Sequence, residues 1–83
     1  MQVNVRYHAF LREKLGRESE LFVFSDGAAV SAGQVFDAFI GAHPEFARLS
    51  HALNLAVNDE LVSFDAPVAE NARVDLLPPY GGG

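Results

Sequence analysis

The sequence contains no cysteine among its 83 residues. This absence excludes disulfide bonds, a thiolate zinc site, an iron–sulfur cluster and a cysteine nucleophile. No apolar run approaches the roughly 20 residues that a membrane-spanning helix needs. The first residues, Met1 to Asn4, lack the basic and apolar segments of a signal peptide. We therefore expect no membrane association, and the cytoplasm is the simplest location.

Basic residues are scarce as well: 6 lysines and arginines stand against 11 acidic residues, which gives a net charge of −5. Because proteins bind nucleic acids by neutralising phosphates with Lys and Arg, we expect no nucleic-acid partner. A partner protein with a basic patch would suit this charge better. The three histidines, His8, His43 and His51, lack the spacing of metal ligands, so we expect no metal site.

The composition is that of one small folded domain, with 49% hydrophobic and 20% charged residues. Val3, Val5 and Tyr7 alternate with polar residues, which predicts a first strand over residues 2–8. A short helix should follow over residues 9–15 and end at Gly16. Further strands are predicted over residues 20–25, 53–58, 61–64 and 73–77.

The main helix should begin at Ser31. Ser31 and Gln34 have the spacing of a capping box, in which each side chain binds a backbone N–H group that the helix leaves unpaired. An apolar stripe follows on one helix face, and Gly41 and Pro44 mark the end. A turn is predicted at Asp26-Gly27, a further helical turn over residues 44–49, and a loop over residues 67–71.

This order of strands and one long helix predicts an α+β domain, with the helix packed across one face of a sheet of about five strands. The residues expected in the core are Val3, Val5, Tyr7, Phe22, Phe24, Phe36, Phe39, Ile40, Leu55, Val57, Val62, Phe64, Val74 and Leu76. The residues expected on the opposite face are Arg6, His8, Leu61, Ser63, Asp75 and Leu77. Leu61 and Leu77 are apolar on an otherwise polar face, which indicates a site for a partner.

The chain ends in Leu77-Pro78-Pro79-Tyr80-Gly81-Gly82-Gly83. The two prolines favour an extended exit from the last strand. Three glycines then present the terminal carboxylate without any side chains. Such a tail is suited to threading a narrow site in which a partner enzyme activates the carboxylate as a mixed anhydride with a nucleotide. A frayed terminus without function is the alternative.

Three motifs resemble those of the ubiquitin-like, β-grasp sulfur carriers, most closely the small subunit of molybdopterin synthase. Residues 7–16 resemble the family's opening, aromatic-x-Ala-x-aliphatic-Arg-Glu. Residues 56–67 resemble its Val-Asn hairpin and the segment after it, and residues 77–83 resemble its Pro-Pro-x-x-Gly-Gly terminus. The resemblance covers nearly the whole chain and implies a β-grasp domain over residues 1–79 and a flexible glycine tail over residues 80–83.

The resemblance also implies a function. In the family, an adenylyltransferase related to ubiquitin-activating enzymes uses ATP to adenylate the terminal glycine, and sulfur then replaces one oxygen to form a thiocarboxylate. The large subunit of molybdopterin synthase receives the tail, and the sulfur passes to precursor Z during molybdenum cofactor biosynthesis. By resemblance, Gly83 carries the sulfur and Gly82 allows its approach. Such a carrier binds no cofactor, is no enzyme by itself, and commonly assembles as two carriers with two large subunits.

The family's docking surface is apolar, and by resemblance the partner-binding residues here are His8, Leu61, Leu77, Pro78, Pro79, Tyr80 and Gly81. His8 stands where an aromatic residue is usual, which either weakens hydrophobic docking or tunes it to a particular partner. Three alternatives stay open: a sulfur carrier for thiamine or another sulfur-containing product, a ubiquitin-like protein modifier, and a passive interaction module with an inert tail.

Overall fold

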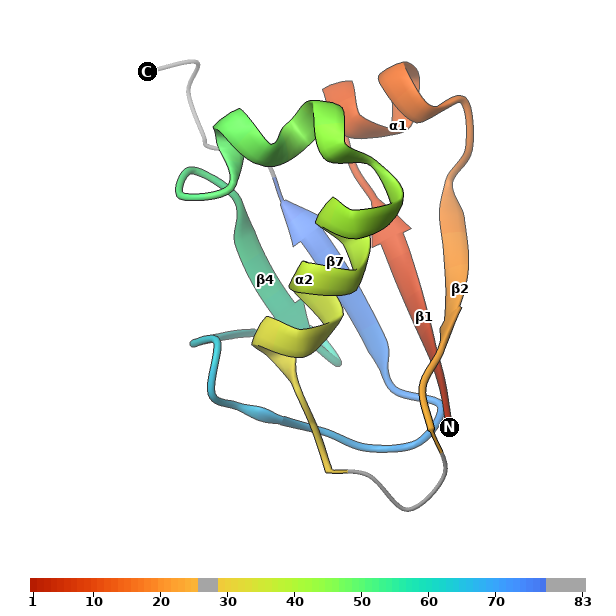
Figure 1. Cartoon of the computed structure of the whole chain (residues 1–83), viewed down its shortest axis with the longest axis vertical. Coiled ribbons are helices and arrows are strands. Elements are labelled where there is room, and N and C mark those ends of the chain that lie inside the picture. The colour runs from red at the N-terminus through yellow and green to blue at the C-terminus, as the bar shows by residue number, and fades with distance from the viewer. Residues whose placement is uncertain (26–28, 78–83) are drawn as a thin grey trace.

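The computed structural model describes residues 1–25 and 29–77, which form a mixed five-stranded sheet with helices on one side (Figure 1). The strands of this sheet are β1 (Gln2–Tyr7), β2 (Ser19–Val23), β4 (Asn54–Val57), β5 (Glu60–Val62) and β7 (Arg73–Leu77). Their order is β2-β1-β7-β4-β5. The central strands β1 and β7 are parallel, and the other neighbours are antiparallel. The predicted α+β class and sheet are confirmed.

Helix α2 (Ala32–Ala42) crosses one face of the sheet, in front of β4, β7 and β1 in Figure 1. The predicted capping box is present at its start. The backbone N–H of Gln34 donates to Ser31 Oγ at 3.2 Å, and the backbone N–H of Ser31 donates to Gln34 Oε1 at 2.8 Å. These bonds fix the point at which the chain turns from strand to helix.

Two shorter helices cover one end of the sheet. Helix α1 (Phe10–Leu15) ends at Gly16, whose φ of 69° is the left-handed conformation that favours glycine, as predicted. The 3-10 helix η1 (Pro44–Leu49) follows α2, with its proline in the first turn. No helix among residues 1–25 and 29–77 is long and apolar enough to cross a membrane.

The core lies between α2 and the sheet and is built from apolar residues of almost every element. Of the expected core residues, eight are buried: Val3, Val5, Tyr7, Phe36, Phe39, Leu55, Val74 and Leu76. Five more are partly buried and pack against the core: Phe22, Phe24, Ile40, Val57 and Val62. Several buried residues were not predicted to lie in the core, among them Leu11, Val30, Phe46, Leu53, Val68 and Ala72. Most of these belong to short segments that close the two ends of the core.

The prediction of a buried Phe64 is wrong, because β5 ends at Val62 and the chain turns away from the sheet. Phe64 is 50% exposed, and its ring stacks on Phe36 with the ring centres 5.3 Å apart. Its carbonyl oxygen accepts a hydrogen bond from the backbone N–H of Gly33 at 2.7 Å. A Cβ atom on Gly33 would lie 3.0 Å from this oxygen, so glycine permits the close approach.

A small second sheet was not predicted. Strand β3 (Val30–Ser31) pairs antiparallel with β6 (Pro67–Val68), inside the segment expected to be a loop. Strands of two residues carry no alternation, so nothing in their pattern distinguishes them from loops. The ends of four longer strands differ from their predicted bounds by one or two residues. The turn expected at Asp26-Gly27 lies outside the described residues.

Candidate functional site

The side of the sheet away from α2, hereafter the outer face, carries the predicted docking residues. Side chains alternate along each strand, so those next to the buried Val5, Leu55 and Val74 point to this side. One row crosses four strands: Arg6 of β1, Asp75 of β7, Ala56 of β4 and Leu61 of β5 lie opposite one another in turn. The structure therefore brings Arg6, Asp75 and Leu61 onto one face, as expected.

The apolar part of the outer face lies over β7, β4 and β5. Leu61 is 68% exposed, whereas Ala56 beside it is buried. Leu77, at the end of β7, is partly buried and lies opposite Asn54 of β4. A large apolar side chain exposed on a sheet face is the arrangement expected of a contact with a partner.

A second apolar strip lies on β2, at the opposite edge of the same face. Leu21 is 56% exposed and Val23 is 71% exposed. These two residues were not predicted as surface contacts, although their alternation with the inward-facing Phe22 is visible in the sequence. The outer face thus has two apolar margins.

A charged cluster separates these margins. Asp75 is the only charged residue that is buried within residues 1–25 and 29–77. Its Oδ1 lies 3.1 Å from His8 Nε2, and its Oδ2 lies 3.4 Å from Arg73 Nε. The guanidinium of Arg73 also contacts Asp59 in the turn between β4 and β5. The burial of Asp75 was not predicted, because the central position of β7 in the sheet cannot be read from the strand itself.

The tail leaves the described structure at Leu77, the last residue of β7. Because β1 and β7 are parallel and Tyr7 lies opposite Leu76, this strand end lies at the same end of the sheet as the entry to α1 (Figure 1). The other predicted site residues lie outside the described residues, namely Pro78, Pro79, Tyr80, Gly81, Gly82 and Gly83.

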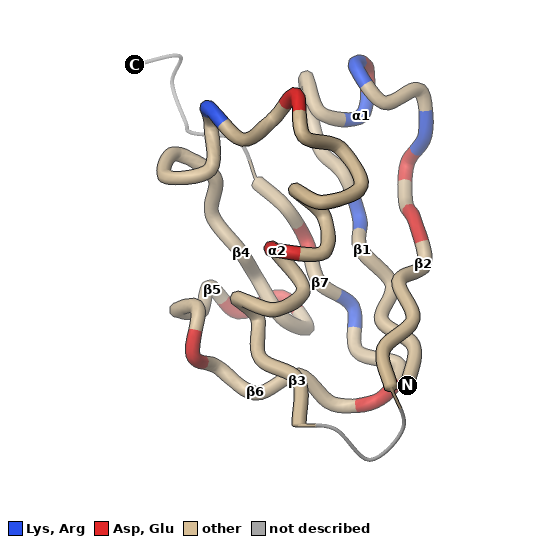
Figure 2. Tube along the Cα trace, viewed as in Figure 1, with Lys and Arg blue, Asp and Glu red and all other residues tan. Residues whose placement is uncertain are grey.

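Charge is unevenly distributed along the molecule (Figure 2). Most basic residues lie in or beside α1 and η1, at the end of the sheet where β7 finishes: Arg12, Lys14, Arg17 and Arg48. Acidic residues occur at both ends, with Glu13, Glu18 and Glu45 among these basic residues. Within the described residues, a second acidic group without nearby Lys or Arg other than Arg73 lies around the β4–β5 turn and the loops on either side of β6: Asp59, Glu60, Asp65 and Glu70. A partner with a basic patch would match this second region.

A further polar network lies between the sheet and α2. Glu20 Oε1 accepts a hydrogen bond from the Tyr7 hydroxyl at 2.7 Å and lies 2.8 Å from Nε2 of His43, which caps the end of α2. Burial alone would raise the pKa of Glu20, but the hydrogen bonds from His43 and Tyr7 lower it below its ordinary value. Burial and the bond to Glu20 raise the pKa of Tyr7. This network joins β1, β2 and α2 and therefore stabilises the fold.

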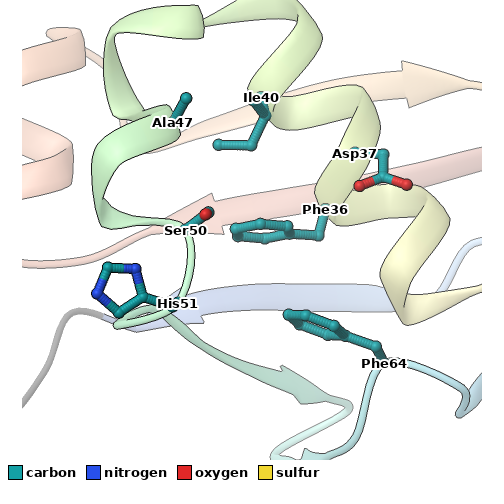
Figure 3. Close-up of a pocket in the computed structure, with 7 residues that line it drawn as sticks. All are labelled: Phe36, Asp37, Ile40, Ala47, Ser50, His51 and Phe64. Carbon is teal, nitrogen blue, oxygen red and sulfur yellow. The ribbon is translucent and has the colours of Figure 1, made fainter.

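An open groove of about 390 Å³ lies between α2 and the segment that follows η1 (Figure 3). Asp37, Ser50 and His51 line it, a set of side chains that occurs in hydrolases. In the described part of the chain no hydrogen bond joins them, and Figure 3 shows the ring of Phe36 between Asp37 and His51. The groove is thus not an assembled catalytic triad. No three His, Asp or Glu side chains of residues 1–25 and 29–77 gather to hold a metal ion.

Comparison with known proteins gives a family and several structural relatives. The chain matches the model of the ThiS family over residues 5–83. Its structure is similar to small archaeal modifier protein 1 from Haloferax volcanii, with 27% identity, 94% of this chain and 97% of that chain covered, and a TM-score of 0.78. A comparison with curated proteins finds no match.

Two other similar structures come from complexes. One is the BexX/CysO complex of Amycolatopsis orientalis, with 26% identity, 98% of this chain and 99% of that chain covered, and a TM-score of 0.68. The other is the complex of subunits 1 and 2 of the molybdopterin-converting factor from Helicobacter pylori 26695, with 21% identity, full coverage of both chains and a TM-score of 0.67. At 21% identity, this second likeness is one of fold alone.

The family match covers nearly the whole chain and includes the terminal glycines. The sheet order and the helix across it agree with the β-grasp fold expected from the sequence. The resemblance noted in the sequence is therefore confirmed, and the chain belongs to the ThiS family of ubiquitin-like sulfur carriers.

Proposed function

We propose that this carrier is the small subunit of a molybdopterin synthase and that Gly83 bears the sulfur. The observation that carries the proposal is the family match, which extends through residue 83 and so includes all three terminal glycines. The Leu77-Pro78-Pro79 stem and the hairpin motif of residues 56–67 favour molybdopterin over other products.

The chemistry begins at a carboxylate, which is a poor electrophile. An adenylyltransferase joins the Gly83 carboxylate to the α-phosphate of ATP and releases pyrophosphate. A sulfur donor then displaces AMP, so that a C–S bond replaces the C–O bond to the nucleotide and a thiocarboxylate remains. In the large subunit this sulfur passes to precursor Z, and water restores the carboxylate. ATP is used by the activating partner, so the carrier itself needs no cofactor and no catalytic residues.

The tail supplies access for these steps. Gly82 and Gly81 have no side chains that would collide with the walls of a narrow active site. Pro78 and Pro79 limit the conformations of the stem before binding, which reduces the entropy lost when the tail is ordered. Tyr80 supplies the one large side chain of the tail as a contact for the partner.

The outer face supplies the docking surface. Leu61 and Leu77 lie on the outer face, and Leu77 and His8 lie at the end of the sheet from which the tail departs, so one partner can hold the domain and receive the tail. The similarity to chains solved as complexes in Helicobacter pylori and Amycolatopsis orientalis supports a hetero-oligomer. We propose an assembly of two carriers with two large subunits.

The test is a variant that lacks Gly82 and Gly83, compared with a matched Gly83→Ala variant that keeps the length and the carboxylate. Each is mixed with the adenylyltransferase, ATP, a sulfur source, the large subunit and precursor Z, and molybdopterin is measured. We expect no product from the truncated chain and reduced product from Gly83→Ala. Full activity of the truncated chain would contradict the proposal. Binding to the large subunit of another pathway instead would assign the sulfur to thiamine or a different product.

A protein modifier is the second candidate, because small archaeal modifier protein 1 is among the similar structures at 27% identity. In this case Gly83 would form an isopeptide bond with a lysine of a target protein. Lys14 is the only lysine of the chain. A Lys14→Arg variant therefore removes every internal acceptor, and peptide mapping for Gly83 joined to lysine then reports modification of other proteins alone.

A further inference from the structure

The outer face contains a polar contact point among its apolar residues. His8 Nε2 lies 3.1 Å from Asp75 Oδ1, and Asp75 is only 6% exposed. The His8 side chain is 40% exposed. One ring nitrogen thus contacts a fixed group within the sheet, while a substantial part of the side chain remains open to the solvent.

The charges around Asp75 determine which atom of this pair donates. Arg73 Nε lies 3.4 Å from Asp75 Oδ2, and Arg6 lies opposite Asp75 on the neighbouring strand. Asp59, in the turn between β4 and β5, contacts the same Arg73 guanidinium through another nitrogen, Nη2. The Asp75 carboxylate, with Arg73 beside it, accepts hydrogen bonds and cannot donate them.

A neutral imidazole carries one proton, and the acceptor at Asp75 places it on Nε2 of His8. Nδ1 then has a free lone pair and acts as an acceptor. Within residues 1–25 and 29–77 no group binds this Nδ1. If a purely apolar surface covered His8, this acceptor would be buried without a partner, which is unfavourable.

We infer that His8 makes the outer face selective for a partner that presents an N–H or O–H donor to Nδ1, beside an apolar surface that covers Leu61 and Leu77. Asp75 is the positioning residue, because it fixes the tautomer of the ring. The inference rests on the proposed function, since it assigns the chemistry of the partner's surface at the proposed docking face.

The tautomer is measured on the isolated full chain by ¹⁵N NMR of the His8 ring at about pH 8, above the ordinary titration range of imidazole. We expect the Nε2–H form to predominate. In Asp75→Asn the amide both donates and accepts, so a mixture of the two tautomers is expected, an effect that a merely structural role of Asp75 would not produce. A predominant Nδ1–H form in the wild-type chain would overturn the inference, and this result does not depend on whether the variant folds.

Three substitutions at His8 test the partner's chemistry. His8→Asn keeps an acceptor near the position of Nδ1, His8→Gln keeps a group that reaches toward Asp75, and His8→Phe keeps only the shape of a ring. Binding to the large subunit of molybdopterin synthase and to the adenylyltransferase of the same organism is measured for each. We expect His8→Phe to weaken binding by up to about tenfold, the effect of one net hydrogen bond, and His8→Asn to weaken it least.

The outcomes separate this inference from the proposed function. If His8→Phe binds as tightly as the wild-type chain or more tightly, the contact is apolar and the inference is wrong. If the wild-type chain binds neither protein, the proposed function is contradicted, and the tautomer measurement alone then supports or overturns the inference.

Discussion

Leu61 provides the most direct test of the docking face, because the side chain is exposed in the free carrier. At 68% exposure it contributes little to the core, so Leu61→Ala should change the free energy of unfolding by less than about 0.5 kcal/mol. Any loss of binding can then be attributed to the interface and not to the fold.

The size of that loss follows from the exposed area. Leucine has three more carbons than alanine, and each is worth about 0.8 kcal/mol when buried, or about 2.4 kcal/mol in all. Because 68% of Leu61 is available for a partner to cover, about 1.6 kcal/mol is expected. This corresponds to a dissociation constant about 15-fold higher.

The assay is titration calorimetry with the large subunit, together with thermal unfolding of the free carrier. Leu21→Ala is the matched control, since Leu21 is the same residue type, is 56% exposed and lies on the opposite edge of the same face. Its dissociation constant should stay within about twofold. Normal binding by Leu61→Ala, with a loss of about tenfold for Leu21→Ala, would show that the partner uses the β2 margin and would refute the assignment.

Three further predictions concern stability, each measured by urea unfolding. Glu20→Gln should lower the free energy of unfolding by about 1–2 kcal/mol at neutral pH, because His43 loses a charged partner. Because the pKa of Glu20 is lowered in the folded chain, this contribution is fully present above the ordinary pKa of a glutamate. It is lost as the pH falls through the lowered pKa, so the stabilities of wild type and variant should converge at pH values below it. Gly41→Ala should stabilise by up to about 1 kcal/mol, because its Cβ would meet no atom within 4 Å, whereas Gly33→Ala should give no gain. Ala9→Gly should stabilise by about 1 kcal/mol, because φ of 51° and ψ of −128° suit glycine.

Each of these predictions has a contradicting result, and the first two have a matched control variant. Glu18→Gln, at an exposed neighbouring position, should be neutral, and an acid dependence unchanged in Glu20→Gln would remove Glu20 as its source. If Gly33→Ala and Gly41→Ala raised the free energy of unfolding equally, the loop beside Gly33 would have to move away from the added Cβ atom at no cost in free energy. A destabilised Ala9→Gly would mean that the unfolded-state entropy of glycine outweighs the backbone strain.

The parts of the fold that were predictable have strong local signals. Ser31 and Gln34 predict the start of α2 because the two hydrogen bonds of the box need that spacing. The alternation of Val3, Val5 and Tyr7 predicts the buried face of β1 for the same kind of reason, since successive side chains of a strand point to opposite sides.

The parts that were missed depend on tertiary context. Asp75 is buried because β1 and β4 lie on either side of β7. The sequence of β7 alone does not reveal which strands will be its neighbours. Phe64 fits the alternation of β5, but the strand ends two residues earlier and the ring packs on Phe36 from outside the core. The pairing of β3 with β6 joins residues far apart in the chain and has no local pattern.

The candidate site divides in the same way. The exposed Leu61 was readable from the sequence, because a leucine on a polar strand face is a local feature. The glycine tail is likewise a local feature of the sequence, and its role stays a prediction. The contact of His8 with Asp75 was not readable, since the two residues are 67 positions apart and meet only because β1 and β7 pair in parallel.

The central claim is that Gly83 carries sulfur, and the most direct measurement is the chemical state of the terminus. The chain is produced together with the adenylyltransferase and a sulfur source, treated with a thiol-reactive alkylating agent, and analysed by intact mass and peptide mapping. Mapping is needed because oxidation of Met1 adds nearly the same mass as exchange of oxygen for sulfur. The chain has no cysteine, so an adduct on the peptide that ends in Gly83 reports a thiocarboxylate, which is the predicted result. An unmodified terminus, under conditions in which the same activating enzyme loads another carrier, would contradict the account.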